Sequence, residues 1–375
     1  MTTYYVRSSG GDDISNDGLS FANGWATLQF ALDQTLAPGD FIYANGTFLL
    51  DTQLDNDVNS GDTTQSGGEI TLIGCNSSGV VDGTRATIDG TSITAGHLFT
   101  IAGGIDYWKY KNLVFQNCAM GDGLYNNTGG HSYHSFVNCR FTGNYRYGVY
   151  ASSYSNVINL YNCEIDNNGD AGIYCMNVAL LEKCSIHHNT LEGIGSYSIY
   201  TRMSDCLIYS NGSHGINVYG WKNFCNIIAN NTTIYNNGGD GIYCGLKADD
   251  SLTFLSEPHL LNVIVANNGG YGINIVTAGI QNKIVMNNIA SYGNASGHCN
   301  WNGGVIPVTN NLVTSDPDFV STTAGSEDLT PQNSALAVSQ PYPSGGTSYS
   351  YIGAIQPQPT AGGGDKYPFP GGRRY

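Results

Sequence analysis

Positive charge is scarce in this sequence, and so is charge of either sign. Lys and Arg total 14 against 29 Asp and Glu in 375 residues, which gives a formal net charge of −15, and charged residues make up 11% of the chain. Such a chain is repelled by the phosphates of nucleic acid and of anionic lipid, so we expect neither nucleic acid nor a membrane as a partner. Since amphipathic helices need a charged outer face, we also expect very little helix.

Long apolar runs and paired metal-binding cysteines are missing as well. No segment has the roughly 20 apolar residues needed to cross a bilayer, and residues 1–5 lack the basic and apolar regions of an export signal. The ten cysteines are too dilute for a small disulfide scaffold and lack the CxxC spacing of a zinc site. These features favour synthesis in a cytosol over export, with an extracellular location as the alternative.

Glycine (50 residues) and tyrosine (26 residues) are abundant, and a Gly-Ile/Val pair recurs along the chain. Its glycines are Gly148, Gly172, Gly193, Gly215, Gly241 and Gly272, at intervals of 24, 21, 22, 26 and 31 residues. A period of this size is typical of a solenoid, in which each coil is too small to bury its apolar face alone.

Two apolar columns run in register with these glycines. Nine residues before each glycine stand Cys139, Cys163, Cys184, Cys206, Thr232 and Val263, and two residues further on stand Phe141, Ile165, Ile186, Ile208, Ile234 and Val265. A spacing of two is the strand period, so we expect both columns to face the core and the residue between them to face outward. The aligned cysteines, with Cys175 and Cys244 in a second inward column, are predicted to be buried free thiols, and disulfides between coils stay open as an alternative.

Asparagine recurs five residues after the cysteine position. The column consists of Asn144, Asn168, Asn189, Asn211, Asn237, Asn268 and Asn294. Amides stacked at the strand spacing of about 4.8 Å can donate and accept along the column, and asparagine tolerates the left-handed conformation of tight turns. We therefore predict a structural asparagine ladder.

The two ends of the chain differ from this regular part. Apolar residues at helical spacing within residues 24–32 predict a short helix that caps the open end of the solenoid. We expect the cap and first coils over residues 1–100, regular coils over 101–300, and C-terminal coils with a second cap over 301–357. Residues 358–375 are rich in Gly and Pro and end in Arg373-Arg374-Tyr375, which predicts a flexible arm.

Several short motifs support one family resemblance that covers nearly the whole chain. They are Tyr4-Tyr5-Val6, Asn16-Asp17-Gly18, Trp25-Ala26-Thr27-Leu28, Pro38-Gly39-Asp40, Asp316-Pro317-Asp318-Phe319 and Ile352-Gly353-Ala354. With the Asn-rich coils, they resemble the right-handed parallel β-helix proteins of the pectate-lyase-like superfamily. The resemblance implies an all-β, single-stranded solenoid with a short N-terminal capping helix, and it leaves the activity open, because the superfamily includes polysaccharide lyases, glycoside hydrolases, and phage tailspikes or other virion proteins.

An outward column of tyrosine and amide side chains indicates carbohydrate binding. Aromatic faces pack on the apolar faces of pyranose rings, and amides match their hydroxyl groups. The candidate residues are Tyr147, Tyr150, Tyr174, Asn217, Tyr243, Tyr271 and Asn274. The alternative is that a β-sheet surface simply favours tyrosine.

Residues with the spacing of a catalytic set are harder to find, and we predict no catalytic residues. Asp249-Asp250 is the one aspartate pair within the regular coils, and we interpret it as a solvated loop. The pairs Arg140 with Glu164, Arg146 with Asp170 and Lys183 with Asp205 share a register one coil apart, which predicts surface ion pairs rather than catalytic bases. His187-His188 has no carboxylate close in the sequence and is interpreted as a surface turn.

Calcium is the one cofactor that the sequence leaves open. Asp55, Asp57 and Asn59 alternate along an acidic loop, and oxygen ligands suit that ion, although the loop lacks the glutamate that completes an EF-hand. A second acidic loop at residues 12–18 is also compatible with calcium, and a simple N-terminal turn is the alternative there.

Taken together, these features predict a non-enzymatic, virion-associated β-helix, such as a phage capsid decoration, tail or host-adhesion component, located in the virion. Its expected partners are other virion subunits, contacted through the C-terminal arm, and a surface polysaccharide, and a homotrimer is expected by analogy with tailspikes. A secreted polysaccharide lyase or glycoside hydrolase and a bacterial surface adhesin remain as alternatives.

Overall fold

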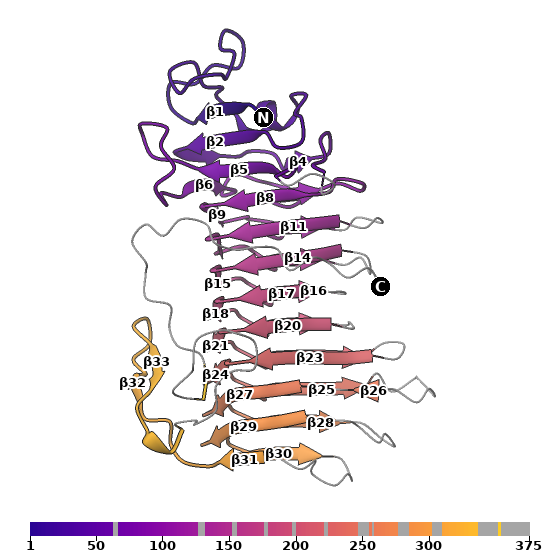
Figure 1. The fold of residues 1–375 in the computed structure, drawn as a ribbon, viewed down its shortest axis with the longest axis vertical. Coiled ribbons are helices and arrows are strands. Elements are labelled where there is room, and N and C mark those ends of the chain that lie inside the picture. Colours follow the sequence, from indigo (N-terminus) through magenta and orange to yellow (C-terminus); the bar gives the residue numbers. More distant parts are fainter. Residues whose placement is uncertain are drawn as a thin grey trace.

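The chain winds into one tall parallel β-helix (Figure 1). The structure is a computed structural model that describes residues 1–62, 67–126, 132–151, 156–175, 179–196, 200–220, 224–246, 255–256, 259–276, 285–301, 310–336 and 352–353. Within this part of the chain almost all strands pair in parallel with the strands one coil above and one coil below. The predicted all-β solenoid is thus confirmed.

Each coil contributes strands to two sheets. A 21-stranded sheet bends into a long face and a short face. The long face contains β1 (Thr3–Arg7), β2 (Phe41–Asn45), β5 (Ile70–Gly74), β8 (Trp108–Lys111), β11 (Ser132–Val137), β14 (Asn156–Tyr161), β17 (Ala179–Glu182), β20 (Tyr200–Ser204), β23 (Phe224–Asn230), β26 (Leu255–Ser256), β27 (His259–Ala266), β29 (Val285–Tyr292) and β31 (Asn310–Val313). The short face contains β3 (Thr47–Leu49), β6 (Ala86–Asp89), β9 (Leu113–Gln116), β12 (Arg140–Thr142), β15 (Glu164–Asp166), β18 (Ser185–His187), β21 (Leu207–Tyr209) and β24 (Thr233–Tyr235), and it continues into the ends of β27 and β29.

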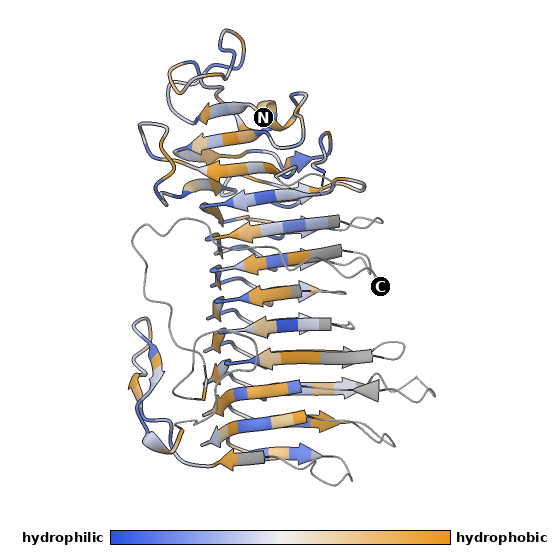
Figure 2. Ribbon diagram, in the orientation of Figure 1, coloured by the Kyte–Doolittle hydropathy of each residue, from blue (hydrophilic) through white to orange (hydrophobic). Residues whose placement is uncertain are grey.

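The second sheet has ten strands and closes the coil. Its strands are β4 (Leu54–Asn56), β7 (Phe99–Ile101), β10 (Leu124–Asn126), β13 (Val149–Ala151), β16 (Ile173–Cys175), β19 (Ile194–Ser196), β22 (Ile216–Gly220), β25 (Ile242–Leu246), β28 (Tyr271–Val276) and β30 (Gly297–Trp301). Hydrophobic and hydrophilic residues alternate along many of the strands (Figure 2), because successive side chains point to opposite faces of a sheet.

The inward columns form the core as predicted. The cysteine column and the column two residues after it are buried throughout, and so are Cys175 and Cys244. All nine cysteines whose side chains the structure describes are free thiols. Burial in an apolar core raises the pKa of the Cys184 thiol well above its usual value, so the thiol stays protonated and donates to the Leu160 carbonyl at 3.3 Å.

The asparagine ladder is present over all seven predicted residues. In each step the amide Nδ2 donates to the Oδ1 of the next asparagine, at 2.9 Å from Asn144 to Asn168 and 2.8 Å from Asn268 to Asn294. The repeat glycine belongs to the same arrangement, because a Cβ on Gly172 would lie 2.8 Å from the Asn189 amide and 2.9 Å from the Gly193 carbonyl. The ladder thus explains why the glycine recurs.

The left-handed turns lie beside the ladder and not in it. Positive φ angles belong to the residues that precede ladder asparagines, such as Asn167, His188 and Asn236, with φ of 52–54°. The ladder asparagines therefore do not use the left-handed conformation that asparagine tolerates. A second asparagine column with positive φ, which includes Asn112 and Asn138 joined at 2.8 Å, lies at the turn between the long and short faces.

The N-terminal cap is the predicted short helix. Helix α1 (Leu28–Leu32) begins after Thr27, whose side chain accepts a hydrogen bond from the Phe30 N–H. Leu28 and Leu32 are buried against the core of the first coils. At five residues, α1 is far too short to cross a membrane, and the described part of the chain has no helix that could.

The end of the described chain covers the lower short face. After β31 it runs through the antiparallel pair β32 (Phe319–Ser321) and β33 (Asp328–Pro331) and the short 3-10 helix η1 (Ser334–Leu336), beside the lower coils (Figure 1). We call residues 319–336 the C-terminal clasp. Its buried Leu329 and Leu336 pack in one apolar cluster with the outward Leu207, Tyr235 and Ile264 of the coils. The predicted arm, residues 358–375, lies outside the described residues.

Candidate functional site

A stack of tyrosine rings runs along the outside of the ten-stranded sheet. Tyr125 of β10, Tyr150 of β13 and Tyr174 of β16 occupy the same register, because their strands pair in parallel. Their ring centroids lie 5.3 and 5.4 Å apart, with interplanar angles of 1° and 8°. We call this outward column, which continues through Gly195, Asn217, Tyr243 and Asn274, the tyrosine wall.

A second column lies beside the tyrosine wall, directly before the repeat glycines. Backbone hydrogen bonds connect its members from coil to coil, and they are His97, Asp122, Tyr147, Ala171, Glu192, His214, Asp240 and Tyr271. We call it the flanking column. Tyr147 leans from it onto the wall, with ring centroids 5.3 Å from Tyr150 and 5.1 Å from Tyr174. Burial raises the pKa of Tyr147, although Arg146 beside it opposes the rise, so the Tyr147 hydroxyl stays protonated at neutral pH.

The wall is interrupted at Gly195, and a pocket opens there. A cavity of about 120 Å³ is lined by Tyr147, Tyr174, Leu191, Glu192, Gly195, Ser196 and Asn217. A Cβ on Gly195 would already lie 3.3 Å from the Tyr174 ring, so a larger side chain would fill the space. We call this cavity the wall pocket.

Two polar side chains give the wall pocket its chemistry. Asn217 is only 4% exposed and donates from Nδ2 to the Glu192 carboxylate at 2.8 Å. The Asn217 Oδ1 is buried and accepts no hydrogen bond from the described residues. This oxygen is closed off from solvent, so a ligand in the pocket meets the Glu192 carboxylate, which Asn217 holds in place.

Two similar histidine and aspartate pairs stand above and below the pocket. At the upper pair His97 Nδ1 lies 2.9 Å from the fully buried Asp122 carboxylate, and the His97 ring stacks on Tyr125 at 3.9 Å. At the lower pair, His214 Nδ1 lies 3.5 Å from Asp240 and accepts from the Asp240 N–H at 2.8 Å.

The lower pair repeats the upper one in its aromatic contact as well. The His214 ring packs on Tyr243 at 4.9 Å. In both pairs the aspartate begins an Asp-Gly-Leu/Ile-Tyr sequence one coil after the histidine, Asp122–Tyr125 and Asp240–Tyr243. The two pairs therefore fix the side-chain geometry at two heights of the same wall.

The structure brings the predicted carbohydrate-binding residues onto one surface, in two groups. Tyr147, Tyr174 and Asn217 line the wall pocket, and Tyr150 packs beside them. Tyr243, Tyr271 and Asn274 lie below, where Asp240 accepts from the Tyr271 N–H at 2.6 Å and from the Asn274 amide at 2.9 Å. Whether this surface binds carbohydrate stays a prediction.

Sequence reasoning missed several residues of this surface. Tyr125 and Asp122 precede the first repeat glycine that was counted, although Gly123 continues the same register one coil earlier. Glu192 lies in the flanking column, which the strand pattern did not single out. Gly195 was not among the candidate residues, yet the side chain that it lacks makes room for the pocket.

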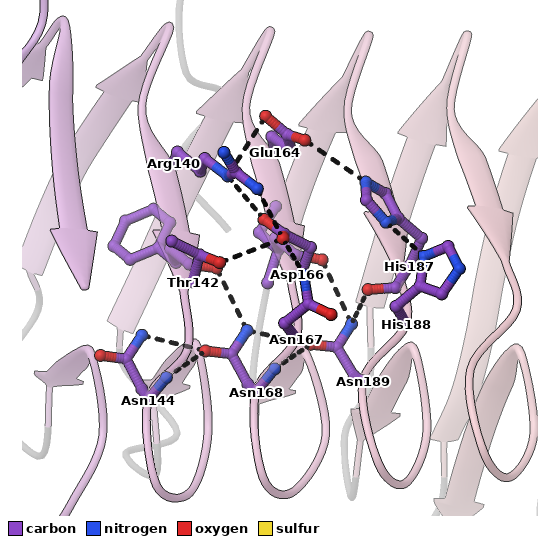
Figure 3. Close-up of polar contacts among 12 residues, drawn as sticks. Arg140, Thr142, Asn144, Glu164, Asp166, Asn167, Asn168, His187, His188 and Asn189 are labelled. Atoms are coloured by element: carbon purple, nitrogen blue, oxygen red, sulfur yellow. Dashed lines mark hydrogen bonds and ion pairs between the residues drawn. The ribbon is translucent and has the colours of Figure 1, made fainter. Parts of the chain in front are cut away.

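A separate polar cluster lies on the outside of the short face (Figure 3). Arg140 donates to the fully buried Asp166 at 2.8 and 2.7 Å and lies 3.4 Å from Glu164, so the predicted pair with Glu164 is confirmed and a stronger partner is added. Burial raises the pKa of Asp166, but the Arg140 guanidinium outweighs it and leaves the pKa lowered. The predicted pair of Arg146 with Asp170 is also present, at 3.6 Å.

The two adjacent histidines belong to this cluster, which corrects the expectation that they have no carboxylate nearby. His187 Nε2 lies 3.5 Å from Glu164, and His188 Nε2 lies 3.5 Å from Glu327 of the C-terminal clasp. The two rings also contact each other through their Nδ1 atoms at 2.9 Å. Because Asp166 and Glu327 are buried and every charged member has a partner, the cluster is built to hold coils and clasp together.

In the candidate calcium loops, several side-chain oxygens accept hydrogen bonds from the protein itself. Asn59 Oδ1 accepts from the Leu36 N–H at 3.0 Å, and Asp55 Oδ1 accepts from Gln53 at 2.6 Å, while Asp57 is exposed. In the loop at residues 12–18, Asp13 accepts from backbone N–H groups at the start of α1. Calcium binding at Asp55, Asp57 and Asn59 stays a prediction, and the described residues contain no cluster of three or more His, Cys, Asp or Glu suited to a metal. Asp249 and Asp250 lie outside the described residues.

Comparison with known proteins identifies the fold. A family model described as "Right handed beta helix region" matches residues 122–289, and no curated protein matches the sequence. Among solved structures, pectate lyase Pel9A is 18% identical with a TM-score of 0.61, covering 96% of this chain and 97% of the other. XylC in complex with xylose is 9% identical with a TM-score of 0.50, covering 85% and 87%, and the Dettilon tailspike protein is 14% identical with a TM-score of 0.49, covering 79% and 60%. At these identities the likeness concerns the fold alone.

Proposed function

We propose that this chain is a non-enzymatic carbohydrate-binding protein whose site is the tyrosine wall. It has the right-handed parallel β-helix fold of the pectate-lyase-like superfamily. The observation that carries this proposal is the wall pocket, in which two tyrosine rings and a carboxylate line one cavity. Few ligands other than saccharides combine apolar ring faces with many hydroxyl donors.

The spacing of the wall supports an extended ligand. Successive coils repeat at about 4.8 Å, which is close to the length of one pyranose unit, so one sugar can be placed on each coil of the wall. Neighbouring rings already stack on both faces of Tyr125 and Tyr150, so the stacking surface is the face of Tyr174 that lies over Gly195. Asn217 and Asn274 stand further down the same column. A saccharide chain lying along the helix axis would contact both groups of predicted residues.

Binding is favoured over cleavage by the composition of the pocket. Glycoside hydrolysis uses two carboxyl groups about 5–9.5 Å apart, and Glu192 is the one carboxylate among the described residues that line the cavity. A lyase needs a basic residue positioned at the sugar, and Arg146, the cation nearest the wall stack, is engaged with Asp170 at 3.6 Å and Asp122 at 4.0 Å. Glu192 nevertheless makes a polysaccharide-cleaving enzyme the second candidate.

The proposal is tested by titrating the protein with defined hexasaccharides, among them cellohexaose, chitosan hexamer and oligogalacturonate, in a calorimeter. Tyr174→Ala should weaken any binding roughly tenfold, since an aromatic contact contributes about 0.5–1.5 kcal/mol beyond its buried area. Tyr133→Ala is the matched control, because Tyr133 is 43% exposed on the long face, away from the wall. Equal losses in both variants, or no binding at all, would refute the proposal.

The same sugars also test the enzymatic alternative. Incubation with and without calcium should release neither unsaturated products nor new reducing ends. Release of either, abolished in Glu192→Gln, would replace the binding proposal by the enzymatic one.

We further propose a setting for this binding, namely a virion component such as a tail or host-adhesion part. The buried column of free thiols supports it, since such thiols are compatible with folding in the reducing cytosol of a host. Other virion subunits are the proposed partners, through residues 358–375, and a homotrimer is the proposed assembly. Deleting residues 358–375 should leave the fold intact and abolish incorporation into particles, and unchanged incorporation would refute the docking role.

A further inference from the structure

The ligand class of the wall pocket can be narrowed from the hydrogen-bonding capacity of its lining. Asn217 uses its Nδ2 donor on Glu192, and its Oδ1 is closed off from solvent, so the amide offers no free donor to a ligand. Glu192 is an acceptor through both carboxylate oxygens. The carboxylate of the pocket therefore favours a ligand that brings hydrogen-bond donors.

The negative charge of the flanking column also disfavours an anionic ligand. Its members Asp122 and Asp240, and Asp170 directly before Ala171 of the column, lie on coils above and below Glu192. The nearby basic residues Arg146, His97 and His214 each already lie against one of these aspartates. A sugar with a carboxylate or sulfate group would thus meet like charge, and Arg146 could not turn to it without leaving its aspartates.

A cation, by contrast, fits both the rings and the carboxylate. An ammonium group near Glu192 would form a charge-assisted hydrogen bond, which is roughly twice as strong as a neutral one. The face of Tyr174 over Gly195 attracts a positive charge through its π electrons, as the face of Tyr147 does for Arg146 at 5.0 Å. The net charge of −15 adds a long-range attraction for a cationic chain.

We propose that the wall pocket selects a saccharide unit with a free amino group, a 2-amino-2-deoxyhexose, over uronic-acid and N-acetylated units. This inference rests on the proposed function and adds the chemical class of the ligand. The ring packs on Tyr174 and the ammonium group pairs with Glu192.

The test compares three hexasaccharides by calorimetry at pH 6 and 150 mM salt: fully deacetylated chitosan, its N-acetylated counterpart and oligogalacturonate. The deacetylated chain should bind about tenfold more tightly than the acetylated one, and oligogalacturonate should not bind measurably. Glu192→Gln should lower the affinity for the deacetylated chain about tenfold and leave the affinity for the acetylated chain unchanged.

A matched control separates the pocket from general attraction to an acidic protein. Asp51→Asn removes one negative charge at an exposed position outside the wall, and it should leave all three affinities as they are. If Asp51→Asn and Glu192→Gln reduce the binding of chitosan equally, the preference is nonspecific and the inference is wrong.

The two levels of the proposal fail in different ways. The acetylated or uronate chain could instead bind tightly, with binding that Tyr174→Ala abolishes and Glu192→Gln leaves unchanged. This result would overturn the amino-sugar inference and leave the saccharide site in place. Absence of binding for every hexasaccharide would overturn both.

Discussion

His134 gives the core a built-in sensitivity to acid. It lies on β11, in register with Trp108 of β8 and Ile158 of β14, and it is fully buried. Its ring nitrogens form no well-aligned hydrogen bond with the described residues. Burial lowers the pKa of His134 to about 3, and the nearby backbone of Ile105 offsets only part of this.

The direction and size of the effect follow from this shift. In the unfolded chain histidine has a pKa of about 6.5, so below that pH the unfolded state takes up a proton that the folded state refuses. The stability linked to His134 is complete above pH 6.5 and is lost as the pH falls toward 3. At pH 4.5, two pH units below 6.5, the loss is about 2.7 kcal/mol at 1.36 kcal/mol per unit.

His134→Phe removes the titrating group and keeps an aromatic side chain of similar size. The free energy of unfolding, from denaturant titrations at pH 7.0 and 4.5, should fall less on acidification in the variant than in the parent protein, by about 2.7 kcal/mol. Other groups titrate in both proteins and cancel in the comparison. His259→Phe, at an exposed position of β27, is the control and should keep the pH dependence of the parent. An unchanged pH dependence in His134→Phe would refute the assignment of a neutral buried histidine.

Three further predictions concern the ladder, the ion pair and the clasp. Asn189→Ala should lower the free energy of unfolding by about 3 kcal/mol or more in denaturant titrations, because it leaves buried neighbours without partners, while Asn23→Ala at an exposed position should change it by less than about 0.5 kcal/mol. Arg140→Met should cost about 3–5 kcal/mol at pH 7, because it leaves the Asp166 carboxylate buried without its arginine. The penalty should shrink as the pH is lowered and the carboxyl becomes protonated, and a penalty independent of pH would contradict this. Leu329→Ala should destabilise the packing of the clasp by about 2–5 kcal/mol. Limited proteolysis should then cleave the clasp faster and the upper coils at the same rate, and an unchanged rate of clasp cleavage would contradict this.

The repeating part of the fold could be predicted because each coil repeats the same physical constraint. Asn168 and Asn189 must meet their neighbours at a fixed height, and Gly172 must leave room for an amide, so both residue types recur at fixed positions. The spacing of the same repeat predicted that the side chains of Tyr150 and Tyr174 point outward.

Features that occur once could not be predicted in this way. Glu327 meets His188 from the C-terminal clasp, 139 residues further along the chain, where no period places it. The wall pocket depends on the side chain that Gly195 lacks, and a missing side chain gives no pattern. One signal was available, since Leu207 and Tyr235 are apolar at outward positions of the short face, which indicates that another segment covers them.

The central claim is that the tyrosine wall binds a saccharide at the wall pocket, and a crystal structure of the protein soaked with fully deacetylated chitosan hexamer tests it most directly. We expect a sugar ring packed on Tyr174, with its amino group within hydrogen-bond distance of Glu192 and further units along the wall. Sugar density at another face, or a pocket without sugar while the hexamer is bound elsewhere, would contradict the claim.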